Sequence, residues 1–201
     1  MDPFYRLTYP SHRPLGGREW SLQCSQVSLN PLLSTQKFFF STRLIALIIG
    51  INTYKSKDIK PLRGAVADAR AFAAYLGNQL SVPQDHIIIL ENESATRAAI
   101  LENLLSLVND PRIRPGDPIV IFYAGHGSEA AAPPGWEAGG RKANIQVTMP
   151  YDVYCQSGGR VVDPIPDRTL DALLAAISQK KGSNIVSFRE IPTSKVCLTI
   201  R

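Results

Sequence analysis

Three almost continuous apolar runs constrain the fold of this chain more than any other feature. They are RLIALIIGI at residues 43–51, HIIIL at 86–90 and DPIVIFYAG at 117–125. A strand with one solvated face alternates apolar and polar residues, and these runs lack that alternation. They therefore predict strands of a mostly parallel sheet that is covered on both faces.

The segments between these runs have the period of amphipathic helices. Two helices are predicted near residues 65–80 and 97–109, the second with Ser94 or Thr96 as its N-terminal cap. A third is predicted to begin near Asp167, and a fourth strand within KKGSNIVSF at 180–188. Strands that alternate with helices predict an α/β fold.

Length and composition indicate one ordered domain with extensions. The chain has 201 residues, 44% of them hydrophobic and 19% charged, which is ordinary for a globular protein. Residues 1–40 contain Pro, Ser and Gly without a sustained period, and they are predicted to form a flexible leader or N-terminal extension. The domain is predicted over 41–187, followed by a divergent tail at 188–201.

Composition also argues against several classes of protein. The formal net charge is +5, but Lys and Arg are scattered, so no nucleic acid is expected as a partner. Cys24, Cys155 and Cys197 lie far apart and form no metal-binding or disulfide pattern, which is typical of reduced thiols. No apolar run reaches the roughly 20 residues of a membrane span. A cytoplasmic location without membrane contact is therefore expected.

Polar residues that follow the apolar runs are the candidate site, because functional groups gather at the carboxyl ends of parallel strands. Asn52 and Tyr54 follow the first run, and His126 follows the third. Histidine can accept a proton from a thiol or hydroxyl and later return it. Gly125 and Gly127 allow close approach and offer backbone N–H groups to an oxyanion. The alternative is that the two glycines form only a tight turn.

Three motifs in order resemble the first half of the caspase-like cysteine peptidases, with metacaspases and related fungal caspase-domain proteins as the nearest match. They are ALIIGINTY, LRGAVADARAFAAYL and IVIFYAGHGSE, and PIPDRTLDALLAAISQKKGSNI is similar to the segment before the family's nucleophile. The resemblance covers residues 43–186. It implies a three-layer α/β/α caspase-like fold and the cleavage of peptide or protein substrates.

The resemblance also implies roles for single residues. His126 would be the general base for a cysteine, and the N–H of Gly127 would bind the oxyanion. Asp68 would help to form an acidic pocket for Arg or Lys of the substrate. Its alternative role, left open here, is that of a first-turn residue favoured by the helix dipole. Arg63 lies nearby, where an Arg would instead suit a substrate Asp.

Calcium activates many metacaspases, so the resemblance implies calcium as a possible activator, with no other cofactor required. Asp152, Asp163 and Asp167 lie in the matching region. Calcium prefers several oxygen ligands. Arg168 stands where the family often has a second adjacent carboxylate, and isolated loop aspartates also serve as turn and cap residues.

The family pattern is lost after GSNI, where a strand should lead into Asp-x-Cys. The chain instead reads VSFREIPTSKVCLTIR, with Arg189 and Glu190 at buried strand positions and Pro192 after them. Neither Cys197 nor Cys155 stands at the nucleophile position. We therefore expect a fold that is incomplete at its C-terminus, truncated before the nucleophile and inactive alone. The fourth strand would be an uncovered edge through which chains self-associate.

Three functions follow from these patterns. The first is a cysteine endopeptidase domain with His126 as base. The second is a non-catalytic family member that acts as a regulator or interaction module, or is an unstable fragment. The third is an α/β module for a small ligand, although the chain has no phosphate-binding glycine fingerprint.

Overall fold

A twisted, mostly parallel sheet forms the centre of the domain. The computed structural model describes residues 43–132, 136, 144–191 and 195–200, and for 190–191 and 195–200 it describes the backbone. The predicted leader at 1–40 lies outside the described residues. In this part of the chain the central sheet has five strands in the order β10-β9-β3-β1-β2. Their bounds are β1 Ile45–Gly50, β2 Ile87–Glu91, β3 Ile119–Ala124, β9 Ile185–Ile191 and β10 Lys195–Ile200.

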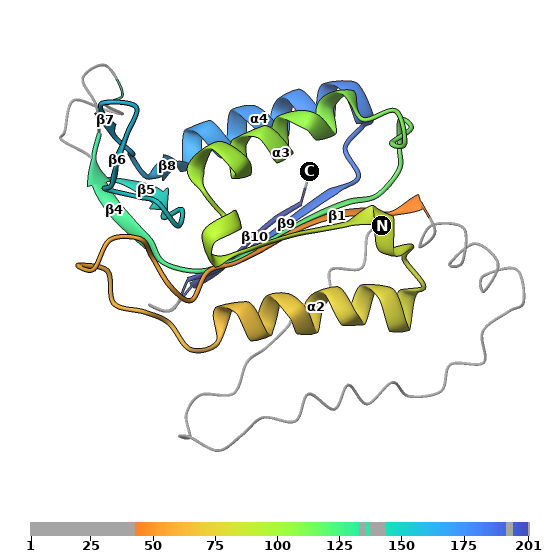
Figure 1. The fold of residues 1–201 in the computed structure, drawn as a ribbon. Coiled ribbons are helices and arrows are strands. Elements are labelled where there is room, and N and C mark those ends of the chain that lie inside the picture. Colours follow the sequence, from red (N-terminus) through yellow and green to blue (C-terminus); the bar gives the residue numbers. More distant parts are fainter. Residues whose placement is uncertain (1–42, 133–135, 137–143, 192–194, 201) are drawn as a thin grey trace, which may run out of the picture.

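Helices cover both faces of this sheet, as the sequence predicted. Helix α2 (Ala65–Leu80) lies on one face, and α3 (Arg97–Asn109) and α4 (Asp167–Lys181) lie side by side on the other (Figure 1). The described chain thus has the expected three-layer α/β/α architecture. Two short 3₁₀ helices, Gln84–His86 and Asn92–Ser94, flank β2.

Strand β1 is an inner strand of the sheet, and all six of its residues are buried. It pairs in parallel with β2 on one side and β3 on the other. Ala46 and Ile48 belong to the apolar cluster beneath α2. Ile45, Leu47 and Ile49 alternate with them and belong to the cluster beneath α3 and α4. Both side-chain faces of the strand need apolar residues, which explains its continuous apolar sequence.

The segments after β3 form two small antiparallel sheets at the carboxyl end of the central one. Strands β4 (Gly127–Ala131), β5 (Asn144–Thr148) and β8 (Ile165–Pro166) make one, and β6 (Gln156–Ser157) and β7 (Arg160–Val161) make the other. Figure 1 shows them together at one end of the domain. Because β4 begins directly after His126, this region surrounds the candidate site.

The expectation of an uncovered fourth strand was wrong. Strand β9 continues through Ile191, and β10 pairs with it in antiparallel register from Lys195↔Ile191 to Ile200↔Val186. The sequence KVCLTI carries β-branched and other apolar residues at alternate positions, which suits a strand. Pro192 lies outside the described residues. The described backbone of the tail, which diverges in sequence from the family pattern, thus belongs to strands of the central sheet.

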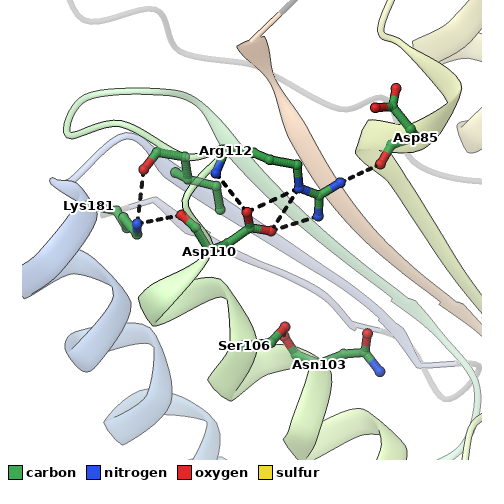
Figure 2. A network of polar contacts seen from close by, with 7 residues as sticks. Asp85, Asn103, Ser106, Asp110, Arg112 and Lys181 are labelled. Carbon is green, nitrogen blue, oxygen red and sulfur yellow. Dashed lines mark hydrogen bonds and ion pairs between the residues drawn. The ribbon is translucent and has the colours of Figure 1, made fainter.

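Polar contacts join the C-terminal ends of α3 and α4 (Figure 2). Lys181 Nζ donates to the carbonyl oxygens of Asp110 at 2.7 Å and Ile113 at 2.9 Å. The Arg112 guanidinium donates to the Asp110 carboxylate and to the carbonyl oxygen of Asp85. Hydrogen bonds from Arg112 lower the pKa of Asp110. The network fixes the turn that leads from α3 towards β3.

Candidate active site

His126 lies at the rim of the sheet, between the end of β3 and the start of β4, and is half-buried. Its Nε2 atom is 2.7 Å from the carbonyl oxygen of Lys60. A carbonyl oxygen only accepts hydrogen bonds, so Nε2 of the neutral ring carries the proton. Nδ1 is then the atom with a free lone pair. The ring is thus oriented so that Nδ1 can accept a proton from another group.

Two tyrosines hold the peptide groups of His126. Its backbone N–H donates to the hydroxyl of Tyr54 at 2.8 Å. The hydroxyl of Tyr123 lies 2.8 Å from the carbonyl oxygen of His126 and 2.9 Å from that of Met149. Burial raises the pKa of Tyr54, and it raises the pKa of Tyr123 well above its ordinary value. Both phenols therefore stay protonated at neutral pH.

Gly125 has no room for a side chain, because two tyrosine hydroxyls lie against it. A Cβ atom at this position would lie 2.6 Å from the Tyr123 hydroxyl oxygen and 3.2 Å from that of Tyr54. The sequence predicted that this glycine allows close approach to the histidine, and in the structure the groups that approach it closely are the two phenols. Gly127 is the first residue of β4 and pairs with Thr148 of β5.

Two asparagines fix the loop that presents the Lys60 carbonyl. Asn92 Oδ1 accepts the N–H groups of Asn52 at 2.9 Å and Thr53 at 3.2 Å. Asn52 Oδ1 accepts the N–H of Val66 at 3.2 Å, and its carbonyl oxygen accepts the N–H of Leu62 at 2.7 Å. Asn52, which the sequence placed at this rim, therefore binds Leu62 and Val66 at the far end of the loop and closes it.

A pocket of about 250 Å³ opens beside the histidine. The loop before α2, the first turn of that helix and the end of β3 line it, through residues Leu62, Arg63, Gly64, Ala65, Asp68, Ala124 and Gly125. Asp68 is exposed in the first turn of α2, and its Oδ2 lies 3.3 Å from the point where a Gly64 Cβ would be. The structure thus brings Asp68 and the neighbour of His126 to one pocket, together with Arg63.

Close packing of α2 on β1 sets the position of this pocket. A Cβ atom at Gly50 would lie 2.7 Å from Cβ of Ala69 and 2.9 Å from the carbonyl oxygen of Ala65. Only glycine at the end of β1 lets the helix begin so near the sheet. The first turn of α2, with Asp68, is therefore held beside the end of β3.

The three aspartates considered for calcium are not arranged as a calcium site. Asp152 Oδ1 accepts the backbone N–H of Arg97 at 2.8 Å and so caps α3. Asp167 forms an ion pair with Arg189. Within the described ranges, no three His, Cys, Asp or Glu side chains form a group that could hold a metal ion. Calcium requires several oxygens at once, so these residues do not fit it.

Among the side chains that the structure describes, no thiol is hydrogen-bonded to the His126 ring. Cys155 is a free, half-buried thiol in the turn between Val153 and β6, and the ring is not among its hydrogen-bond partners. The side chains of Cys24 and Cys197 lie outside the described part. On the strand next to β3, Arg189 pairs with Tyr123 and Glu190 with Ala124, so these residues occupy the end of β9 nearest the histidine.

Sequence reasoning found His126, Asn52, Tyr54 and Asp68 but missed three contributors to the site. The Lys60 contact is made by a backbone carbonyl, which no side-chain pattern can reveal. Tyr123 reads as one more apolar residue in a buried strand, and Asn92 as part of a polar loop. A Tyr next to Ala-Gly at a strand end was the one available signal, because a buried phenol needs a hydrogen-bond partner.

Comparisons with known proteins show which sequences this chain is similar to. The caspase domain family model matches residues 43–177. Metacaspase-1 of Ajellomyces capsulatus is 32% identical over 124 residues, which are 59% of this chain and 32% of that protein. Metacaspase-1 of Saccharomyces cerevisiae is 31% identical over 140 residues, or 67% of this chain and 30% of that protein. The chain spans about a third of the length of the curated relatives that it matches.

A solved structure shows the same fold. The crystal structure of protein GSU0716 from Geobacter sulfurreducens aligns with a TM-score of 0.53 and 21% identity, over 73% of this chain and 48% of that one. The described residues contain no helix of the length and apolarity needed to cross a membrane.

Proposed function

The chain belongs to the caspase domain family, and on this premise we propose that it carries the general-base half of a cysteine endopeptidase site. In this proposal His126 is the base and Gly127 the oxyanion donor. A peptide with Arg or Lys before the cleaved bond binds beside them. The observation that carries the proposal is the 2.7 Å contact between His126 Nε2 and the Lys60 carbonyl oxygen, which leaves Nδ1 as the proton acceptor.

The chemistry follows from the orientation of the ring. Nδ1 takes the proton of a cysteine thiol, and the thiolate attacks the carbonyl carbon of the peptide. The N–H of Gly127 donates to the oxyanion that forms. When the C–N bond breaks, the histidine returns its proton to the leaving amine, and water then hydrolyses the thioester.

The nucleophile is the part that this chain does not provide in the proposal. The family pattern has Asp-x-Cys after the strand adjacent to the histidine strand. Here that strand is β9, and Arg189 and Glu190 stand near its end. We expect the isolated chain to bind peptides without cleaving them.

The preference for Arg or Lys rests on Asp68. Its carboxylate lines the pocket next to Gly125, where the residue before the cleaved bond would lie. Arg63 lines the same pocket and would attract an acidic side chain instead. The first turn of a well-anchored helix holds Asp68 in place, and we therefore assign the stronger influence to Asp68.

A non-catalytic role is the second candidate. The ion pair of Arg189 with Asp167 supports it, because this contact ties the end of β9 to the start of α4. Such a domain would bind peptides or other proteins through the same pocket. Calcium has no step in either candidate, because the three aspartates do not fit the ion.

Peptide binding and cleavage by the full 201-residue chain test the proposal. Fluorogenic tripeptides that differ only in a final Arg, Lys or Asp are titrated by fluorescence anisotropy, with and without calcium. We expect Arg and Lys peptides to bind about tenfold more tightly than the Asp peptide, which corresponds to one partly buried charge pair. Asp68→Asn should remove this preference, whereas Asp58→Asn should keep it, because Asp58 does not line the pocket.

A cleavage assay tests the expected inactivity of the chain. Release of the fluorophore that is lost in both His126→Ala and Cys155→Ala would show that Cys155 serves as nucleophile, which would overturn the proposed inactivity. Binding without cleavage agrees with the proposal. No binding of any peptide would overturn it.

Self-association is proposed at a different place from the one first expected. Strand β10, rather than the fourth strand, is the outer strand at this side of the described sheet. An outer strand offers unpaired backbone N–H and C=O groups to another chain. Sedimentation velocity over a concentration series checks this, and a constant monomer mass would contradict it.

A further inference from the structure

We propose that Tyr54 and Tyr123 are positioning residues of His126, whose hydroxyls hold the N–H and the carbonyl oxygen of that residue. The inference rests on the proposed function only in so far as His126 is the base. The two tyrosines come from distant parts of the sequence, one after β1 and the other in β3. Both are almost fully buried, with 7% and 3% of their surface exposed.

The chemistry of donors and acceptors fixes the direction of each bond. A backbone N–H can only donate, so the 2.8 Å contact from His126 uses the Tyr54 oxygen as acceptor. Carbonyl oxygens can only accept, so the proton of Tyr123 points to the carbonyl of His126 or Met149.

The two phenols therefore hold opposite sides of the same residue. Tyr54 accepts the N–H of His126, and Tyr123 donates to the carbonyl oxygen of His126 or of Met149. Both phenols are buried, and a buried hydroxyl or peptide group left without a partner is costly. Both peptide groups that flank the Cα atom of His126 are thus fixed.

Fixing the Cα atom also fixes where the ring can go. The Tyr54 ring lies 5.3 Å from the imidazole, centroid to centroid, at an angle of 38°. The Lys60 carbonyl holds Nε2 at 2.7 Å. The backbone, one ring face and one ring nitrogen are therefore restrained together, which leaves Nδ1 in one direction. A catalytic group needs this kind of support from its surroundings.

Nuclear magnetic resonance of the full chain tests the proposal without any substrate. The hydrogen exchange rate of the His126 amide and the ring ¹⁵N shifts, which report its tautomer, are compared in wild type, Tyr54→Phe, Tyr123→Phe and Tyr75→Phe. Tyr75 is 44% exposed and takes no part in the bonds to the peptide groups of His126, so it is the control. Each substitution removes one hydroxyl and keeps the ring.

We expect the His126 amide to exchange about tenfold faster in Tyr54→Phe, which removes its acceptor. The Nε2–H tautomer should predominate in wild type and become mixed in both Tyr54→Phe and Tyr123→Phe. Tyr75→Phe should change neither quantity. Other amides of β3 should keep their exchange rates in Tyr54→Phe.

Equal His126 exchange in Tyr54→Phe and Tyr75→Phe would overturn the inference, as would uniform acceleration throughout β3. An unprotected His126 amide in wild type would overturn it even if the variants do not fold. Loss of peptide binding would instead sink the proposed function, and the exchange data would still decide the role of the two tyrosines.

Discussion

The imidazole of His126 is bonded to the backbone carbonyl of Lys60, which precedes it by 66 residues. The group that binds the ring of the candidate base is therefore a backbone carbonyl in a loop. That loop runs between β1 and α2, and its geometry depends on the amides of Asn52 and Asn92. Changes in residues that never touch the ring should consequently alter its orientation.

Asn92 gives the sharpest test of this dependence. Its Oδ1 atom accepts two backbone N–H groups, and its φ of 42° lies in the left-handed region that Asn and Asp tolerate. Asn92→Ala loses both the acceptor and this tolerance, and should lower the free energy of unfolding by about 2–3 kcal/mol. Asn92→Asp keeps both and should stay within about 1 kcal/mol of wild type in urea unfolding. Equal losses in the two variants would contradict the assigned role.

Gly125 and Gly77 form a matched pair for the packing beneath the histidine. A Cβ at Gly125 meets the Tyr123 oxygen at 2.6 Å, whereas a Cβ at Gly77 in α2 has nothing within 4 Å. Gly125→Ala should lower the unfolding free energy by about 2–3 kcal/mol, because buried side chains must shift. Gly77→Ala should raise it by about 0.5–1 kcal/mol, because it restricts the unfolded chain and favours helix. Urea denaturation measures both, and a tolerated Gly125→Ala would contradict the packing.

The sheet and its helices could be predicted from the sequence because continuous apolar runs and helical periods are local signals. The predicted strands at 43–51, 86–90 and 117–125 correspond to β1, β2 and β3, and Thr96 caps α3 through a 3.2 Å bond from the N–H of Ala99. The pairing of β10 with β9 was missed. It depends on long-range partners, and Arg189, Glu190 and Pro192 conceal the pattern of a buried strand.

The candidate site was predicted only in part, for a physical reason. His126, Tyr54 and Asn52 can be recognised in the sequence because they are polar residues that follow apolar runs. The groups that orient His126 cannot be recognised in this way, because Lys60 acts through its backbone and Tyr123 through a hydroxyl in an otherwise apolar strand. The contacts of the aspartates are hidden in the same way, since no spacing reveals that Asp152 accepts the N–H of Arg97 or that Asp167 pairs with Arg189.

Acid sensitivity should trace partly to Asp110. Hydrogen bonds from Arg112 lower the pKa of Asp110 in the folded state. The contribution of Asp110 to stability is therefore complete above its unfolded pKa, which is about 4. It is lost as the pH falls through the lower, folded value. Asp110→Asn should therefore cost about 1–3 kcal/mol at neutral pH and progressively less below about pH 4.

The control for this measurement is Asp58→Asn, at an exposed aspartate outside the network of Figure 2. Urea unfolding from pH 7 to pH 3 follows both variants. A constant difference between wild type and Asp110→Asn at every pH would contradict a contribution from the ionised carboxylate.

At Thr148 we expect that removal of a buried hydroxyl does not lower the free energy of unfolding. The residue is 2% exposed, and its Oγ1 has no hydrogen-bond partner among the described residues. It lines a cavity of about 30 Å³ between the sheet and the layer of α3 and α4. A buried hydroxyl without a partner costs about 1–3 kcal/mol, so the isosteric Thr148→Val should leave the unfolding free energy unchanged or raise it by about 1 kcal/mol. Ser187→Ala, at a second buried hydroxyl of the same cavity, is the companion variant. A loss of more than about 1 kcal/mol of unfolding free energy in Thr148→Val would contradict this prediction, because it would mean that the hydroxyl has a partner in solution. That partner would be bound water, since the cavity exceeds the roughly 15 Å³ that one water needs.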